Sequence, residues 1–371
     1  MKTGKELYQE HMDRYMKALR FEKPDRTPVI INADSFCAVH KGVKMSDFVS
    51  NPELSFQTVF DTVQELGDVE GSVSPANPLC FTALLTKVKL PGKELPDNVM
   101  WQIVEEETLR VEDYDAILEK GWQPVMQDVL ANRLGLDMAA MGDSMKFMPM
   151  ATQKAMDAGY IGTSSAFMGN VTEHLSFGRS YPKFIKDLYK MPDKVDAVLD
   201  VIEQENLEQL RQQIRTAKEN NSMPPVVFGG SARGASEFFT PKLWERFIWR
   251  RVKKVAETAI EEGFMISFHV DSDWTRDLEY FTEIPAKMGI FESDGVTSKE
   301  KFLKLLEGKM VFKGDVPAGL LALGTPDEVY NYCIKLKSDI GNGLILSSGC
   351  TIPMNAKFEN VKAMVAAASG K

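Results

Sequence analysis

The stretch that decides the fold of this chain is a short apolar run, Gly263-Phe264-Met265-Ile266-Ser267-Phe268, which ends in His269-Val270-Asp271. A second run of this kind, Leu344-Ile345-Leu346-Ser347-Ser348, ends in Gly349-Cys350. Runs that are this short and almost continuously apolar are typical of strands buried on both faces of a parallel sheet. Each run therefore predicts a buried strand with polar side chains just beyond its end.

Similar apolar runs recur in the second half of the chain, and stretches with helical periodicity separate them. The runs lie at residues 226–228, 289–291 and 310–312, and the helical stretches lie at residues 243–262, 297–307, 327–338 and 356–368. This alternation predicts parallel strands joined by crossover helices. A doubly wound sheet shares the pattern, but no Gly-x-Gly-x-x-Gly follows the first apolar run at residues 27–34, which weakens a nucleotide-binding version. We therefore expect a (β/α)8 TIM barrel.

The barrel is expected to span the chain as a single domain of residues 1–371, with two additions in its first half. A helical stretch at residues 3–19 belongs to an N-terminal helical extension of residues 1–26. Between about residues 75 and 122, apolar and polar side chains alternate in two short segments, at 85–90 and at 101–105. Such alternation is typical of half-exposed antiparallel strands, so we expect a β insertion here.

The composition excludes several classes of protein. The chain has 44% hydrophobic and 26% charged residues, as ordinary globular proteins do, and its net charge of -9 argues against a broad nucleic-acid-binding surface. No stretch approaches the roughly 20 apolar residues that a membrane helix needs. The four cysteines are scattered, and the N-terminus lacks the apolar core of a signal peptide. We therefore expect reduced thiols and a cytoplasmic protein without nucleic-acid or membrane partners.

Polar side chains follow several of the expected strands, and a barrel brings the ends of its strands together in one ring. His269, Asp271 and Cys350 would supply an imidazole, a carboxylate and a thiolate to this ring, a ligand set that suits an open zinc site. Glu237, which follows the run at residues 226–228, is a candidate fourth ligand or a nearby base. The four residues together support a zinc site more strongly than any one of them does alone.

Structural roles compete with each of these interpretations. Backbone hydrogen bonds can satisfy His269, and Asp271 can cap the next helix or orient His269. Cys350 can be a small buried hydrophobic residue, and Glu237 can be a solvated or helix-capping side chain. Carboxylates at strand ends are also common for solubility alone.

Four motifs add a resemblance that covers nearly the whole chain. They are Met16-Lys17-Ala18-Leu19-Arg20 through Pro24-Asp25-Arg26-Thr27-Pro28-Val29, then Lys313-Gly314-Asp315-Val316-Pro317-Ala318, Gly324-Thr325-Pro326-Asp327-Glu328-Val329, and Gly349-Cys350-Thr351-Ile352-Pro353 onward to Asn360. With these motifs the chain resembles the uroporphyrinogen decarboxylase superfamily. The resemblance implies an (α/β)8 barrel with an N-terminal helical extension.

The superfamily has two main branches, and the chain is similar to one more than to the other. The decarboxylase branch acts on the acetate groups of a porphyrinogen without a cofactor, and it usually carries Arg-Gln-Ala-Gly-Arg after the first strand. Residues 32–40 contain no arginine, so a substrate with many carboxylates lacks cationic partners there. The other branch contains zinc-dependent methyltransferases that work with a methyl-corrinoid protein, including the coenzyme M methyltransferases.

The methyltransferase branch carries His-x-Cys and, much later, a second cysteine. His269 matches the histidine and Cys350 matches the second cysteine, whereas Asp271 stands in place of the first cysteine. A carboxylate in place of a thiolate makes zinc a harder and stronger Lewis acid. This departure favours a methyl donor that offers an oxygen atom, such as an aryl methyl ether.

The resemblance therefore implies a zinc methyltransferase that works with a corrinoid carried by a separate protein. Zinc would polarise the ether oxygen and stabilise the departing phenolate, while the reduced cobalt attacks the methyl carbon. Asp315 and Glu292, which also follow or end expected strands, are candidate catalytic residues that guide protons or hold the substrate. Phe238, Phe239 and Trp274 are candidates for an apolar pocket wall.

Three other functions remain open at the level of the sequence. One is a metal-free decarboxylase on the same barrel, and another is a non-catalytic protein that binds a corrinoid or a tetrapyrrole. The third is methyl transfer in the opposite direction, from a methyl-corrinoid to a small acceptor such as the thiol of coenzyme M.

Overall fold

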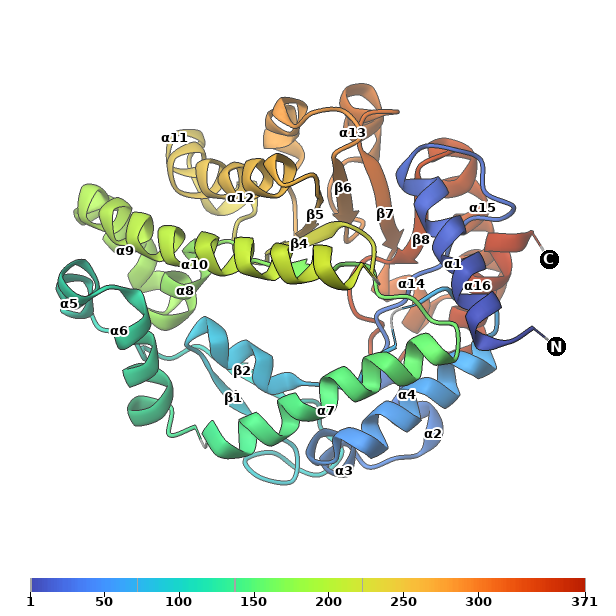
Figure 1. Ribbon diagram of the computed structural model, residues 1–371, viewed down its shortest axis with the longest axis horizontal. Coiled ribbons are helices and arrows are strands. Elements are labelled where there is room, and N and C mark those ends of the chain that lie inside the picture. The colour runs from blue at the N-terminus through green and yellow to red at the C-terminus, as the bar shows by residue number, and fades with distance from the viewer. Residues whose placement is uncertain (1, 72, 137, 222, 371) are drawn as a thin grey trace.

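Six parallel strands form the main sheet of the protein. The computed structural model describes residues 2–71, 73–136, 138–221 and 223–370. The six strands are β3 (Ala166–Phe167), β4 (Val226–Ser231), β5 (Met265–Val270), β6 (Gly289–Ser293), β7 (Val311–Val316) and β8 (Leu344–Ser348). Each strand pairs in parallel with the next along the chain. The arrows of β5, β6 and β7 point the same way in Figure 1, so the carboxyl ends of the strands meet at one edge.

Short backbone segments close this sheet into a barrel. Residues 29–30 pair in parallel with Leu346 of β8 on one side and with Gly71 on the other. The N–H of Ile161, a few residues before β3, donates to the carbonyl of Glu70 over 2.8 Å. Six strands and these two segments therefore give eight staves around one ring in the described part of the chain. The expected (β/α)8 barrel is confirmed.

Helices connect the strands and cover the outside of the barrel. The α-helices are α1 (Gly4–Leu19), α2 (Ser35–Lys41), α3 (Met45–Ser50), α4 (Pro52–Leu66), α5 (Asp113–Lys120), α6 (Trp122–Asp128), α7 (Met138–Asp157), α8 (Thr172–Gly178), α9 (Tyr181–Lys190), α10 (Pro192–Asn220), α11 (Pro241–Trp244), α12 (Arg250–Glu261), α13 (Lys299–Leu306), α14 (Ala318–Leu323), α15 (Pro326–Ile340) and α16 (Phe358–Ser369). Shorter 3-10 and π segments are η1 (Pro78–Leu84), η2 (Val129–Arg133), η3 (Ser236–Phe238), η4 (Glu245–Trp249) and η5 (Thr275–Glu283). All four helical stretches expected in the second half are present, as α11 with α12, α13, α15 and α16. The start of α15 is fixed by a capping box between Thr325 and Glu328.

The barrel holds one hydrophobic core inside its ring and another outside it. The inner core joins Ile30, Ile161, Val226, Ile290, Val311 and Ile345 of the ring to Tyr15, Ala18 and Leu19 of α1. Tyr15 and Leu19 are only 1% and 2% exposed, so α1 closes the amino-terminal end of the barrel. The outer core lies between the strands and the helices around them. A site inside the barrel must therefore open at the carboxyl ends of the strands, as in other barrels of this type.

The expected β insertion is a small antiparallel sheet of β1 (Lys87–Lys89) and β2 (Gln102–Val104). Just after β2, the Glu105 carboxylate accepts a hydrogen bond from Arg233 over 2.6 Å and another from the backbone N–H of Tyr181. These contacts tie the insertion to the loop after β4 and to the start of α9. In Figure 1, β1 and β2 lie on the side toward which the strand arrows point.

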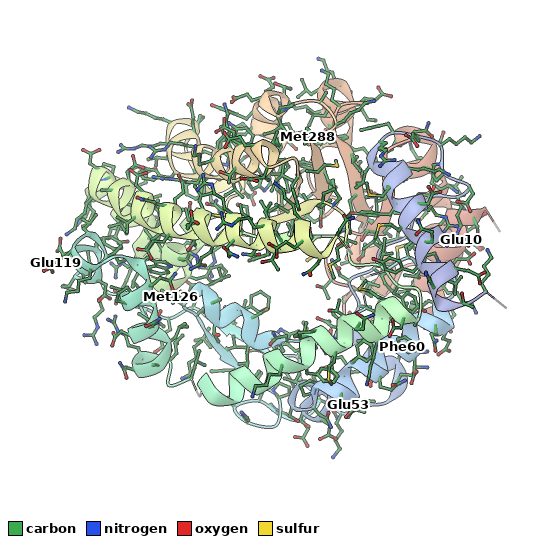
Figure 2. All side chains as sticks on the ribbon, viewed as in Figure 1. Glu10, Glu53, Phe60, Glu119, Met126 and Met288 are labelled. Atoms are coloured by element: carbon green, nitrogen blue, oxygen red, sulfur yellow. The ribbon has the colours of Figure 1, made fainter. Side chains whose placement is uncertain are left out.

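The outer surface carries many charged side chains. Figure 2 shows Glu53 and Glu119 at the periphery, where both are exposed. Among the residues that the structure describes, no helix is both long enough and apolar enough to cross a membrane.

Candidate metal centre

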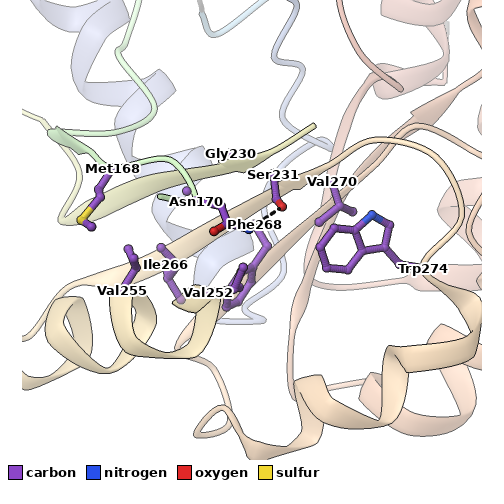
Figure 3. Close-up of a pocket in the computed structure, with 11 residues that line it drawn as sticks. Met168, Asn170, Gly230, Ser231, Val252, Val255, Ile266, Phe268, Val270 and Trp274 are labelled. Carbon is purple, nitrogen blue, oxygen red and sulfur yellow. Dashed lines mark hydrogen bonds between the residues drawn. The ribbon is translucent and has the colours of Figure 1, made fainter. Parts of the chain in front are cut away.

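One face of strand β5 packs against α12 and the other faces the interior of the barrel, and its polar residues lie on the interior face. Ile266, Phe268 and Val270 line a cavity of about 10 Å³ on the side of the strand that faces α12 (Figure 3). A cavity of this size has room for about one water molecule, so it is too small for a substrate. Because side chains alternate along a strand, His269 and, just beyond the strand, Asp271 face the interior of the barrel.

Three potential ligand atoms meet at the carboxyl ends of β5 and β8. The Nε2 atom of His269 lies 3.7 Å from Oδ1 of Asp271 and 3.9 Å from Sγ of Cys350. All three atoms lie within 4.8 Å of one another. A tetrahedral zinc ion with ordinary bond lengths separates its ligand atoms by roughly 3.3–3.8 Å. One ion can therefore bridge the three side chains after shifts of less than about 1 Å.

A buried carboxylate fixes the orientation of the imidazole. Nδ1 of His269 lies 3.2 Å from Oε2 of Glu292, which also accepts a hydrogen bond from Lys313 over 2.9 Å. The hydroxyl of Ser267 donates to the other oxygen of this carboxylate. Burial by itself would raise the pKa of Glu292, but Lys313, His269 and Ser267 together hold it well below its usual range. Glu292 is thus ionised and holds the proton on Nδ1, so that Nε2 points toward Asp271 and Cys350.

The same contacts shift the pKa values of His269 and Asp271. Burial would lower the pKa of His269, but hydrogen bonds with Cys350 and Glu292 and the charges of nearby carboxylates raise it to about 10. Burial is the main cause that raises the pKa of Asp271. A metal ion that bound here would displace the second proton of His269, which is the usual coupling between metal binding and proton release.

The comparisons with known proteins agree with this architecture. Residues 152–370, more than half of the chain, match the family described as Uroporphyrinogen decarboxylase (URO-D). The chain belongs to this family. Among solved structures, a methyltransferase from Methanosarcina mazei is similar with a TM-score of 0.70 and 18% sequence identity, and the match covers 96% of this chain and 97% of that one. An identity this low shows a shared fold. No curated protein shows significant sequence similarity.

Other candidate site residues of this URO-D family member lie apart from the three ligand atoms. Glu237 is exposed in η3 and does not belong to the group formed by His269, Asp271 and Cys350. Asp315 is buried in β7, where it accepts a hydrogen bond from the Tyr332 hydroxyl over 2.8 Å. The structure therefore brings together three of the four expected ligands, and of the two candidate catalytic carboxylates only Glu292 contacts the group.

A buried carboxyl group near the mouth was not expected from the sequence. Glu173, on α8, is 6% exposed and accepts the backbone N–H of Arg233 over 3.0 Å. Burial, with a smaller contribution from the charge of Asp271, raises the pKa of Glu173 to about 7. The sequence contained no signal for this residue, because α8 follows a two-residue strand that has no apolar run before it.

The aromatic residues at the mouth also differ from those expected. Phe239 is 5% exposed and Trp274 is fully buried, and both belong to the outer core. There Trp274 lines the small cavity of Figure 3 and does not form the wall of a substrate pocket. Phe238 is 44% exposed but lies in η3, where it packs against Tyr181. Among the described residues, Phe228 is an aromatic residue whose ring contacts this group, with its centroid 5.4 Å from that of His269.

Proposed function

We propose that this URO-D family protein is a zinc-dependent methyltransferase. In this proposal, a methyl group moves between a small substrate, an aryl methyl ether, and the cobalt of a corrinoid that a separate protein carries. The observation that carries the proposal is the convergence of His269, Asp271 and Cys350 at the open end of the barrel.

The three side chains suit zinc in their chemical type, and His269 is already held in one orientation. Imidazole, carboxylate and thiolate are common zinc ligands, and three protein ligands leave a fourth position open, as in catalytic zinc sites. The imidazole is already oriented by Glu292, and histidines that bind metals almost always donate their other N–H to a carboxylate, a backbone carbonyl or a water molecule. The thiol of Cys350 takes part in no disulfide. These properties are better explained by a metal site than by a cluster of polar groups with a purely structural role.

When bound, zinc would supply a Lewis acid for the ether oxygen, and the corrinoid would supply the nucleophile for the methyl carbon. The carbon–oxygen bond breaks with its electron pair left on the oxygen, which becomes a phenolate and then takes up a proton. The chain contributes the orientation of His269 through Glu292 and a barrel end that excludes bulk water from one side of the substrate. Asp271, a carboxylate ligand, keeps the site hard and therefore suited to oxygen.

The cationic side chains near the mouth do not favour a polycarboxylate substrate. Lys313 is held by Glu292, and Arg233 pairs with Glu105 and stacks on Phe177 with its guanidinium carbon 3.6 Å from the ring centroid. Cations that are already paired bind further carboxylates less well. This pattern supports methyl transfer over decarboxylation of a porphyrinogen, and the fold shared with a methyltransferase agrees with it.

The proposal is tested by methyl transfer to free cob(I)alamin kept reduced by a chemical reductant. Zinc-loaded protein is mixed with 2-methoxyphenol, and the loss of cob(I)alamin absorbance and the release of the demethylated phenol are followed together. We expect both in the wild-type protein and neither in Cys350→Ala. Cys80→Ala, which removes an exposed free thiol outside the ligand group, is the matched control and should keep the activity. Equal transfer by Cys350→Ala, or none by a zinc-loaded wild type over a panel of aryl methyl ethers, would contradict the proposal.

A further inference from the structure

Two aromatic rings line the inner face of the barrel beside the candidate metal centre. Phe167 of β3 and Phe228 of β4 are paired across the two strands, and their rings stack with centroids 5.7 Å apart and an interplanar angle of 15°. Phe228 in turn lies 5.4 Å from His269, with the two rings inclined by 31°. We call Phe167 and Phe228 the aromatic wall.

The aromatic wall is exposed although it points into the barrel. Phe167 is 58% exposed and Phe228 is partly exposed, whereas the residues of the inner core at the other end are nearly all completely buried. An exposed apolar surface inside a concave site is a typical feature of a ligand-binding pocket. The wall therefore lacks the covering that packing gives to the other aromatic residues of the strands.

Two glycines leave room in front of the wall. A Cβ atom added to Gly230 would meet one atom within 4 Å, Cε1 of Phe228 at 3.6 Å, and one added to Gly169 would meet nothing closer than 3.6 Å. Gly230 pairs with His269 across β4 and β5, so this room lies beside the imidazole. Neither glycine has a left-handed backbone, and neither is needed for a turn. Their lack of a side chain thus serves to keep space open.

We propose that the aromatic wall binds the ring of the methyl donor by edge-to-face contact, with the space at Gly169 and Gly230 left for that ring. Phe167 and His269 flank Phe228 on opposite sides, so the ring of the donor packs against the inward edge of Phe228. In that position it lies next to His269, which brings an oxygen substituent toward the open side of the candidate metal ligands. The wall selects planar aromatic donors, because a ring in edge-to-face contact gains a favourable quadrupole arrangement that an aliphatic donor does not. The inference rests on the proposed function for the chemistry of the methyl group, but the ring site itself does not require zinc.

The test measures binding of anisole and phenol to the full chain by ligand-observed NMR, with and without zinc. Phe228→Leu keeps a large apolar side chain but removes the ring, and we expect it to raise the Kd for anisole by about ten-fold. Gly230→Val fills the open space at a backbone position that accepts a side chain, and it should abolish binding. Phe238→Leu removes an exposed ring outside the wall and is the matched control, with an unchanged Kd.

The outcomes separate this inference from the proposed function. Unchanged anisole binding in both Phe228→Leu and Gly230→Val, with zinc content equal to that of the wild type, overturns the aromatic wall as the ring site. Weaker ring binding in these variants, in a protein that transfers no methyl group, supports the ring site and contradicts the proposed reaction. In an active enzyme, Phe228→Leu should raise the KM for anisole by a similar factor but leave the KM for an aliphatic methyl ether unchanged.

Discussion

Replacement of Glu292 tests whether its carboxylate, which contacts Nδ1 of His269, increases the zinc affinity of the candidate metal centre. Glu292→Gln removes the charge that holds the Nδ1 proton of His269 but keeps the size of the side chain. Outer carboxylates of this kind typically contribute a factor of about 10–100 to metal affinity, which corresponds to about 1.4–2.7 kcal/mol. We expect the zinc affinity to fall within this range and the bound metal to remain detectable.

The single variant has a second effect that must be separated from the first. Lys313 donates to Glu292 over 2.9 Å, and both side chains are only 5–6% exposed. Removing one partner of a buried ion pair leaves the other charge uncompensated and typically costs about 3–5 kcal/mol of folding free energy. The double variant Glu292→Gln, Lys313→Met removes both charges, so its stability should return close to that of the wild type.

The assay is competition for zinc against a chromogenic chelator, with urea unfolding of the metal-free proteins in parallel. We expect the double variant to be stable and to bind zinc about 10–100 times more weakly than the wild type does. A stable double variant with wild-type affinity would refute the role of Glu292. A loss of affinity far beyond about 100-fold would also refute it, because Glu292 would then bind the metal directly.

Three further changes probe other parts of the account. Tyr15→Ala opens a cavity in the inner core, where α1 closes the barrel, and should lower the free energy of unfolding by about 3–5 kcal/mol in urea titration. Tyr15→Phe should change this free energy far less. The pKa of Glu173 is raised to about 7, so this group destabilises the folded state as pH rises from about 4.5 through 7. Glu173→Gln should therefore gain up to about 3 kcal/mol over the wild type between urea titrations at pH 5 and at pH 8, and an equal pH dependence in the two proteins would contradict this. Asp271→Cys should keep zinc but lower demethylation of an aryl methyl ether relative to methyl transfer to a thiol, because the zinc becomes softer; an unchanged ratio of the two rates would contradict the role assigned to the carboxylate.

The strands whose residues form short, almost continuously apolar runs could be predicted from the sequence. The strands that end near His269 and Cys350 were predictable because both of their faces are buried, which leaves a continuous apolar signal. The segments at residues 29–31 and 70–71 close the ring through isolated bridges. The first of these segments was visible as a strand candidate, but the second was not, because Glu70 and Gly71 interrupt its apolar pattern.

The candidate metal ligands could be predicted from the sequence, whereas the side chains around them could not. His269, Asp271 and Cys350 could be grouped because each ends or follows an expected strand. The contact between Glu292, Lys313 and His269 depends on the register of three neighbouring strands, which hydrophobic patterns do not specify for inward-facing charges. The exposure of Phe167 and Phe228 was equally hidden, because an apolar residue in a strand reads as core whether or not the barrel is filled in front of it.

The measurement that tests the central claim most directly is the zinc content of the purified protein after reconstitution, determined by plasma mass spectrometry. Wild type, His269→Ala and Cys350→Ala are compared, with Cys80→Ala as the control for loss of a thiol. The account predicts about one zinc per chain in the wild type and the control and a strong loss in the other two variants. Zinc retained by both His269→Ala and Cys350→Ala, or no zinc in the reconstituted wild type, would contradict it.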